Sequence, residues 1–253
     1  MYAAERHQLL AQRSRRDGRI DVGDMAAELG VAPETIRRDL GVLERQGIVR
    51  RVYGGAVTVE RLDFEPGVAQ RDQTNAAEKD RIARAALDEI PERGTVLIDA
   101  GTTTARLATL LPADRELTVI TNSVPVAAIV ASRTAITLHL LGGRVRGTTL
   151  AAVESWTLNA LDGLLVDVAF LGANGFSATR GCTTPDIAEA AVKAAMVTAA
   201  RRRVVLADSS KHGADQLSRF AAWADIDVLI TDTGLDATAI PELEDAGPRV
   251  VLT

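Results

Sequence analysis

Apolar residues in the first 57 positions are spaced as in short amphipathic helices. In the stretch VGDMAAEL, Met25, Ala26 and Leu29 fall on one helical face. Gly30, a residue that readily takes a positive φ, ends this pattern. Pro33 begins the next periodic stretch, where its missing N–H costs nothing. The pattern predicts three helices, at residues 3–14, 22–29 and 33–46.

Two short β-type runs follow the third predicted helix. Residues 48–52 and 56–59 are apolar or β-branched in pattern, and Gly54-Gly55 supplies a turn between them. Three helices followed by such a hairpin predict a winged helix-turn-helix domain, which we assign to residues 1–58. A polar stretch with Pro66 and Gly67 comes next, so a linker is expected at residues 59–78.

The pattern then changes to short, near-continuous apolar runs separated by helical stretches. Such runs are typical of parallel strands buried on both faces, and their alternation with helices indicates crossover connections. We therefore expect an α/β fold with a mainly parallel sheet in residues 79–253, entered by a helix at 76–90. The predicted strands are 95–99, 117–121, 137–141, 167–172, 203–208, 227–231 and 250–253.

Charge is distributed unevenly along the chain. The net charge of −5 argues against nucleic-acid binding by the whole chain. Residues 1–58, however, carry ten Arg and no Lys against eight acidic residues, while the remainder carries 19 basic against 26 acidic residues. This asymmetry suggests that the N-terminal segment alone meets an anionic partner, although solvated surfaces also produce such a split by chance.

Composition excludes several classes of protein. One cysteine, Cys182, cannot form an intramolecular disulfide, and three histidines with one cysteine are a poor inventory for zinc. The apolar runs are shorter than the about 20 residues that span a bilayer, and the N-terminus lacks a secretory pattern. We expect a cytoplasmic protein with no membrane partner, no metal and no cofactor.

The third predicted helix carries the strongest candidate chemistry. A helical wheel places Ile36, Leu40 and Leu43 within about 60° of one another, so they form a buried stripe. The opposite face suits the major groove, where arginine binds guanine bidentately, and the hairpin suits phosphate or minor-groove contacts. The candidate DNA-binding residues are Glu34, Thr35, Arg37, Arg38 and Arg45 on the helix and Arg50, Arg51 and Tyr53 on the wing.

A simpler interpretation of the two adjacent arginines is a solvated helix face. On an arbitrary helix, Arg37 and Arg38 would more often be solvated, with Glu34 and Asp39 as ion-pair partners. Their position after a short helix and a glycine turn, and before a basic hairpin, favours DNA recognition instead.

The loops after the predicted strands suggest a ligand site. Asp99 ends the first of these strands, and a Gly-Thr-Thr-Thr run leads directly into a helix, where free N–H groups and hydroxyls suit a phosphate. Turn geometry alone explains this run equally well. In open α/β sheets, however, ligands bind outside the carboxyl ends of the strands. The candidate effector residues are Asp99, Gly101, Thr102, Thr103, Thr104, Asn122, Gly142, Gly143, Arg144, Asn174, Asp208 and Lys211.

These candidates divide by chemistry. Arg144 and Lys211 are candidate partners for an anion, and Asn122 and Asn174 suit sugar hydroxyls. Taken one at a time, each residue is about as well explained by a structural function.

The string TIRRDLGVLERQGIVRRVYGGAV, with MAAELGV upstream, resembles the DNA-binding signature of the DeoR/GlpR family of bacterial regulators. Two positions depart from that signature. Ala32 stands where members usually have a serine N-cap, which is worth roughly 1 kcal/mol. Tyr53 stands where they usually have histidine. Neither departure affects the arginines.

The second part of the chain also resembles this family. The strings DAGTTT, TNS, LLGG, GANG and DSSK are similar to its effector domain, and Arg71 with Glu78-Lys79 fits its linker helix. The stretch GTTLAAVESW lacks a glycine that such regulators often have, which leaves the pocket wall and the effector's identity open. The resemblance implies a fold related to ribose-5-phosphate isomerase, a phosphorylated sugar or related metabolite as effector, double-stranded operator DNA as partner, and a homodimer or homotetramer.

Three functions are consistent with these sequence features. The first is a repressor of sugar catabolism genes controlled by a phosphorylated sugar. The second is a sugar-phosphate isomerase-like enzyme with an accessory N-terminal domain, in which Asp208 and Lys211 imitate a catalytic carboxylate and lysine. The third is a DNA-binding module on a purely structural oligomerisation domain, which leaves the loop residues unexplained. The sequence favours the regulator and predicts no enzymatic activity.

Overall fold

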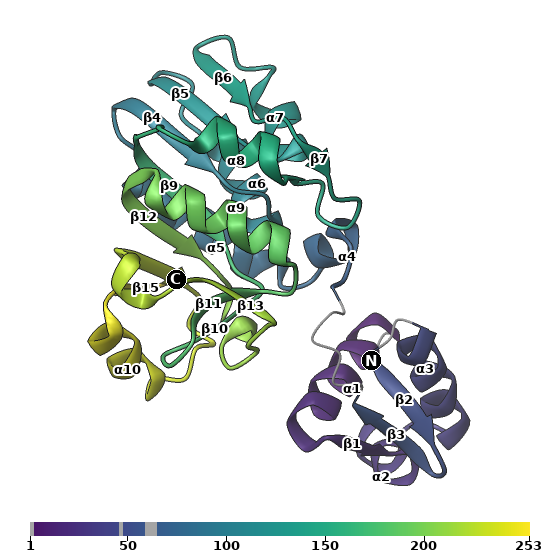
Figure 1. The fold of residues 1–253 in the computed structure, drawn as a ribbon. Helices are drawn as coiled ribbons and strands as arrows, with labels where there is room; N and C mark the ends of the chain where they lie inside the picture. Colours follow the sequence, from purple (N-terminus) through teal and green to yellow (C-terminus); the bar gives the residue numbers. More distant parts are fainter. Residues whose placement is uncertain (1–2, 46–47, 59–64) are drawn as a thin grey trace. The chain divides into compact units, whose positions relative to one another are not determined.

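The computed structural model describes residues 3–45, 48–58 and 65–253. The chain forms two compact units, Met1–Phe64 and Glu65–Thr253 (Figure 1). Residues 65–78, which the sequence assigned to a linker, belong to the second unit. The rest of the expected linker, residues 59–64, lies outside the described residues.

The first unit has three helices and a small sheet. The sheet has the order β1-β3-β2, because a three-residue strand that the sequence did not predict pairs antiparallel with one arm of the hairpin. The three predicted helices are present, and residue 46 at the end of the third lies outside the described residues. The elements are α1 Ala3–Asp17, β1 Arg19–Asp21, α2 Val22–Leu29, α3 Pro33–Arg45, β2 Val49–Val52 and β3 Gly55–Thr58.

Local chemistry fixes the limits of these elements. The Asp21 carboxylate accepts two backbone N–H groups at the start of α2, and Gly30 ends that helix with φ of 63°. A Cβ at Gly55 would lie 1.9 Å from the carbonyl oxygen of Ile20, so pairing between β1 and β3 requires glycine there. The core residues Ile36, Leu40 and Leu43 are fully buried, which confirms the predicted stripe.

The second unit is built on one seven-stranded parallel sheet. Its order is β15-β14-β12-β9-β4-β5-β6, and all seven predicted strands are in it. One expectation was wrong for two strands: β6 and β15 are edge strands rather than strands buried on both faces, and their Leu140 and Leu252 are 52% and 42% exposed. The strands are β4 Arg93–Ile98, β5 Glu116–Thr121, β6 Ile136–Leu140, β9 Val166–Gly172, β12 Ala200–Leu206, β14 Val228–Thr231 and β15 Arg249–Leu252.

Helices cover both faces of this sheet (Figure 1). Side chains of β4 alternate between the two faces of the sheet, so Val96 and Ile98 pack in one core and Leu97 packs in the other. One core lies under α5 Ala76–Ala85, its 3-10 extension Ala86–Glu89, α6 Thr102–Leu110 and α7 Val124–Val130. The other lies under α8 Ser155–Leu161, α9 Ile187–Thr198 and α10 Ala239–Ala246.

Several short elements complete the unit. They have two to six residues, too few for a periodic apolar pattern, and the sequence did not predict them. They are helix α4 Val68–Gln73, the hairpin β7 Arg144–Val145 and β8 Ala152–Val153, the sheet of β10 Gly175–Ser177, β11 Gly181–Thr184 and β13 Ser218–Ala221, and the 3-10 helices Ser209–Lys211 and Trp223–Asp225.

The strand order contains one reversal. From β4 the chain runs outward to β5 and β6, and it then returns to β9 on the other side of β4 before continuing to β12, β14 and β15. Ligands in open α/β folds bind in the crevice at such a reversal, outside the carboxyl ends of the strands. We call this end of the sheet the carboxyl edge. Across residues 3–45, 48–58 and 65–253, no helix combines the length and apolar character needed to cross a bilayer.

Candidate functional site

Helix α3 presents its arginines to solvent. Its buried side faces the core, so Arg37 and Arg38 point outward and are exposed. Arg37 pairs with Glu34 at 3.0 Å in the first turn, and both side chains are exposed. Within the part of the chain that the structure describes, Arg38 makes no hydrogen bond or ion pair, so its guanidinium is available to an external partner.

Asp39 does not neutralise these arginines. It is buried and accepts hydrogen bonds from Arg6 at 2.5 Å and His7 at 2.9 Å, both on α1. Burial opposes ionisation of Asp39, but the bonds from Arg6 and His7 outweigh it and lower the pKa of the carboxyl. The solvated-face interpretation therefore holds for Glu34 and is wrong for Asp39, which holds α1 against α3.

The wing and α3 enclose a groove of about 400 Å³. Tyr53, at the tip of the hairpin, is fully exposed. A Cβ at Gly41 would lie 3.9 Å from Arg45 Nη1 and 4.0 Å from Arg51 Nη1, which places both guanidinium groups over the same stretch of α3. The lining residues are Val22, Arg37, Leu40, Arg51, Val52, Tyr53, Gly54 and Gly55.

Of the predicted DNA-binding residues, Arg37, Arg51 and Tyr53 line this groove, and the others are outside its lining: Glu34, Thr35, Arg38, Arg45 and Arg50. Arg50 is exposed and precedes Arg51 in β2, so strand alternation points it to the opposite face of the hairpin. Thr35 is half-buried in the first turn of α3, where its N–H donates to the Ala32 carbonyl. This backbone bond replaces part of what a side-chain cap at position 32 would supply.

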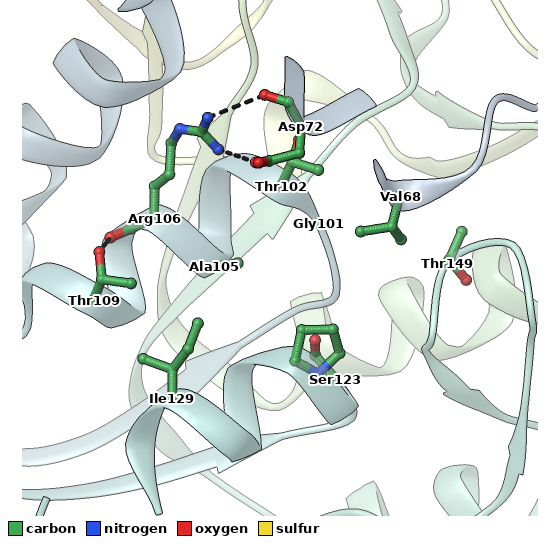
Figure 2. Close-up of a pocket in the computed structure, with 11 residues that line it drawn as sticks. Val68, Asp72, Gly101, Thr102, Ala105, Arg106, Thr109, Ser123, Ile129 and Thr149 are labelled. Carbon is green, nitrogen blue, oxygen red and sulfur yellow. Dashed lines mark hydrogen bonds and ion pairs between the residues drawn. The ribbon is translucent and has the colours of Figure 1, made fainter. Parts of the chain in front are cut away.

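A second pocket, of about 320 Å³, opens in the second unit where α4, α6 and α7 meet (Figure 2). Of the predicted effector residues, Gly101 and Thr102 line it. Arg106 reaches from α6 to the Asp72 carboxylate and backbone carbonyl on α4, which closes one side (Figure 2). The lining residues are Val68, Asp72, Gly101, Thr102, Ala105, Arg106, Thr109, Ser123, Pro125, Ile129 and Thr149.

Thr102 is the member of the threonine run that lines the pocket. Gly101 precedes α6 in an extended conformation and lines the pocket beside it. Thr102, Thr103 and Thr104 are all buried, and the Thr104 hydroxyl donates to the Gly101 carbonyl at 3.0 Å. The run therefore supplies one pocket residue and a structural turn.

Asp99 lies behind the pocket rather than in it. Its carboxylate accepts from the Gly172 N–H at 3.0 Å and pairs with Lys193 of α9, whose ammonium also donates to the Gly172 carbonyl at 3.0 Å. Burial raises the pKa of the Asp99 carboxyl, and the Lys193 charge opposes that shift. Phe220 lies 5.3 Å from the ammonium. This pair joins the ends of β4 and β9 to α9.

Lys79 is the centre of a cationic cluster. It is 4% exposed at the start of α5, and its ammonium donates to the Arg71 carbonyl. Burial lowers the pKa of Lys79 to about 8; the charge of Asp208 opposes that shift, and the charges of Lys211, Arg106 and Arg71 add to it. Lys79, Lys211, Arg71 and Arg106 thus gather at the carboxyl edge with Asp208, while Glu65 pairs with Arg71 and both Asp72 and Asp80 pair with Arg106.

Asp208 is engaged inside the protein. Its Oδ1 accepts from Asn75 Nδ2 at 2.7 Å and from the Ser210 hydroxyl. Lys211 follows in the 3-10 helix, half-buried. The Asp208 carboxylate therefore holds the segment that precedes α5.

The loops after β5 and β6 place their predicted residues differently. Asn122 donates to the Ala152 carbonyl at 3.1 Å, while its Oδ1 is buried without a hydrogen-bond partner among the described residues. The Gly142 carbonyl accepts from Thr157 at 2.8 Å. Gly143 has φ of 154° and packs so closely that a Cβ would lie 2.7 Å from the Val153 carbonyl oxygen. Gly143 thus allows the hairpin to pass α8, whereas Gly142 contributes only its backbone carbonyl.

Arg144 and Asn174 have separate surroundings. Arg144 pairs with Glu154 at 2.6 Å across the β7–β8 hairpin and is 54% exposed, outside the pocket lining. Asn174 follows β9, accepts from Thr184 at 3.1 Å and donates to Glu65 at 2.9 Å. The structure thus brings Gly101, Thr102 and Lys211 near the cationic side of the edge and leaves Arg144 outside it.

Sequence reasoning missed most of the charged residues of the edge. Lys193 lies within a helix 94 residues from its partner, and nothing in a linear pattern joins the two. Arg71 and Lys79 were noticed as a family pattern but not as site residues. Glu65, Arg106, Arg146 and Glu189 carried no signal of their own.

Family models match both units. Residues 6–61 match the DeoR-like helix-turn-helix domain, and residues 74–233 match the DeoR C terminal sensor domain. The HTH-type transcriptional regulator GlpR of Haloferax volcanii is 38% identical over 99% of this chain and 98% of its own length. A putative aga operon transcriptional repressor of Escherichia coli O157:H7 is 33% identical over 98% of this chain and 93% of its own length.

Solved structures are more distant. Ribose 5-phosphate isomerase A from Methanocaldococcus jannaschii covers 55% of each chain at a TM-score of 0.41 and 20% identity. The probable sor operon regulator from Shigella flexneri covers 67% of this chain and 90% of its own, at a TM-score of 0.45 and 14% identity. The fold assignment rests on the observed sheet rather than on these two likenesses. Since both units match family models and the curated relatives align along nearly the whole length, the chain belongs to the DeoR/GlpR family of HTH-type transcriptional regulators.

Proposed function

We propose that the protein is a cytoplasmic repressor that binds a double-stranded operator through α3 and the wing and leaves it when a phosphorylated sugar binds at the carboxyl edge. It acts as a homodimer or homotetramer, because a single winged helix contacts one half-site and operators are commonly paired half-sites. The genes controlled are those of sugar catabolism.

The DNA-binding part of this proposal is supported by exposed guanidinium groups that pair with none of the described residues. Arg38 offers five guanidinium donors to a base edge, while Arg45 and Arg51 flank the same helix for phosphate contacts. Arg37, already paired with Glu34, is better suited to orienting that carboxylate than to an independent base contact. Tyr53, fully exposed at the hairpin tip, is suited to a groove or backbone contact.

The single observation that carries the effector part is the environment of Lys79. Burial lowers the pKa of this ammonium to about 8, and the charges of Lys211, Arg106 and Arg71 add to that shift, so Lys79 carries its charge at an energetic cost. A phosphate removes that cost by pairing with the cations. The N-terminus of α6, with Thr102 at the pocket wall, offers hydrogen bonds to the same group.

Release from DNA requires that the effector prefer one arrangement of the protein over another. An effector shifts operator affinity only by its differential affinity for the DNA-bound and free arrangements. The carboxyl edge provides a means, because residues 65–75, which directly follow the first unit in sequence, supply Val68 and Asp72 to the pocket wall.

The test is a thermal-shift screen of the full chain with phosphorylated sugars and their unphosphorylated counterparts. A ligand at 100 times its dissociation constant stabilises by about 2.7 kcal/mol. Stabilisation by phosphorylated compounds alone supports the proposal, and no stabilisation by any of them contradicts it. Each stabilising compound is then incubated with the protein and analysed for chemical change, since turnover would support the isomerase-like alternative.

A further inference from the structure

Glu65, the first residue of the second unit, is buried under three donors. Its carboxylate is 4% exposed. Oε1 accepts from Asn174 Nδ2 at 2.9 Å and lies 3.3 Å from Arg71 Nη1, while Oε2 accepts from Arg146 Nη1 at 3.0 Å. The donors come from the end of β9, from α4 and from the turn after β7. We call Glu65, Arg71, Arg146 and Asn174 the Glu65 cluster.

Arg71 is only partly satisfied in this cluster. Its Nε and Nη2 are buried and make no hydrogen bond to any residue that the structure describes. Unpaired buried donors of a cation are costly, and their presence indicates a missing acceptor. Arg146, by contrast, is satisfied by Glu189 at 2.6 Å and Asp186 at 3.1 Å besides Glu65.

The cluster adjoins the pocket. Arg146 lies 3.4 Å from the hydroxyl of Thr149, which lines the pocket. The Val68 N–H donates to the Thr148 carbonyl at 3.1 Å, so α4 lies over that turn. Residues 65–75 therefore cross the carboxyl edge as a strap, held at one end by the Glu65 cluster and at the other by Asn75 on Asp208.

We propose that the Glu65 carboxylate is an internal occupant of an oxyanion subsite formed by Arg71, Arg146 and Asn174, and that the effector carries a second acidic group which displaces it. This inference rests on the proposed function, and it narrows the ligand class from phosphorylated sugars to phosphorylated sugar acids. The Nε and Nη2 groups of Arg71, which have no acceptor among the described residues, then donate to the second acidic group of the effector.

Exchange of the Glu65 carboxylate for the carboxylate of a ligand suits a protein that changes state when the ligand binds. The donors keep an anion throughout, so neither guanidinium is left buried without a partner. What changes is Glu65 itself, because its carboxylate is released while the ligand stays. Since Glu65 is the first residue after the DNA-binding unit in sequence, its release frees the end of the strap that follows that unit along the chain.

The subsite itself is tested by chemical rescue. Glu65→Ala removes the internal carboxylate, and sodium formate supplies a small free one. Formate should raise the melting temperature of Glu65→Ala well above the effect of equal sodium chloride, and leave wild type unchanged. Glu92→Ala is the matched control, since it removes a carboxylate that is 87% exposed. Equal responses of Glu65→Ala and Glu92→Ala to formate would overturn the subsite.

The ligand class is tested with two probes that differ at one carbon. 6-Phosphogluconate and glucitol 6-phosphate share a chain and a phosphate, but only the first has a carboxylate. Calorimetry should show that Glu65→Ala binds the acid at least roughly tenfold more tightly than wild type does. The reason is that the Glu65 carboxylate no longer competes for the charge-assisted hydrogen bonds of the subsite. Binding of the alditol should change far less. No gain for the acid, or an equal gain for both probes, would overturn the inference.

Two further comparisons distinguish a failure of the internal-occupant proposal from a failure of the proposed function. Glu65→Gln retains the shape and loses the charge, so it should show the same gain for the acid if Glu65→Ala is too unstable to measure. The phosphorylated-sugar screen on wild type judges the proposed function by itself. If wild type is stabilised in that screen but the Glu65 variants gain nothing, the function stands and the internal-occupant proposal is wrong.

Discussion

Charged residues serve different purposes on α3 and at the carboxyl edge. On α3, Arg38 is exposed and unpaired within the described structure, and solvent and salt already screen its charge. At the edge, Lys193 and Asp99 are buried at 5% and 1% exposure, and each satisfies the other. The first surface is ready for an anionic partner as it stands, whereas the buried charges of the second are already paired inside the protein.

Substitutions of these two kinds of charged residue should therefore differ in their effects on DNA affinity and on the free energy of unfolding. Removing an exposed, unpaired arginine leaves nothing uncompensated in the fold, so its loss shows only in DNA affinity. Removing one member of a buried pair leaves the other charge without a partner, which is costly even when no ligand is present. Five predictions test this difference between exposed and buried charges, and those with the greatest expected change in free energy come first.

Lys193→Met should destabilise the protein by about 3–5 kcal/mol, because Asp99 is left buried and unpaired. Urea unfolding measures the free energy of unfolding. Arg93→Ala is the control, since it breaks an exposed pair with Glu116 and should cost less than about 1 kcal/mol. Similar losses in the two variants would remove the contrast between buried and exposed charges.

Lys211→Ala and Thr102→Ala should leave operator affinity unchanged and weaken the effector response. Loss of a hydrogen bond to a charged group costs about 1.5–3 kcal/mol, so Lys211→Ala should show the larger shift in dose–response. Fluorescence anisotropy of a labelled operator, titrated with the best compound from the screen, measures both quantities. Thr198→Ala, at an exposed threonine on α9, is the control. A normal dose–response in the Lys211 and Thr102 variants would contradict the site.

Arg38→Ala should weaken specific operator binding by roughly 1–3 kcal/mol and relax discrimination at one base pair. The free energy of unfolding should stay that of wild type, because no described residue pairs with Arg38. A competition gel shift against unrelated DNA measures discrimination, with Arg93→Ala again as control. Unchanged discrimination in Arg38→Ala would remove Arg38 from the recognition surface.

Effector affinity should fall as the pH rises through about 8, where the buried Lys79 loses its proton in the free protein. Binding of an anion raises this pKa, by on the order of one unit, so the loss is roughly tenfold, or about 1.4 kcal/mol. Calorimetry from pH 7 to 9.5 measures it. A flat profile for wild type would show that the Lys79 charge does not contribute to binding.

Lys79 also gives a stability prediction of opposite sign. Its pKa is lowered in the folded state, so between about 8 and 10.5 the unfolded chain binds more protons. Relative to Lys79→Met, the stability of wild type should therefore rise with pH across this window. A difference that falls or stays constant would contradict the assigned environment.

Most of the architecture could be predicted from local patterns. Runs such as 117–121 are β-branched and apolar because both faces of the sheet are covered, and the stripe of Ile36, Leu40 and Leu43 follows from helical periodicity alone. Strand β1 could not be predicted, since three residues carry no period and pair only because Gly55 lets β3 approach.

The carboxyl edge was predicted in position but not in chemistry. Strand ends identified Gly101 and Thr102 correctly as edge residues, because parallel strands end together. The charges that act there come from far along the chain or from a stretch that resembles a linker. Lys193 meets Asp99, and Glu65 meets Asn174, only through the tertiary fold. A sequence shows which polar residues lie in loops, but it does not show the residues with which their side chains pair.

Operator binding and its release by an effector are measured together when the full chain selects fragments from a genomic DNA pool, with and without phosphorylated sugars. A few fragments with paired half-sites should be enriched, Arg38→Ala should lose them, and one class of phosphorylated compound should release them. Enrichment that no such compound changes, or the absence of any enriched fragment, would contradict the proposed function.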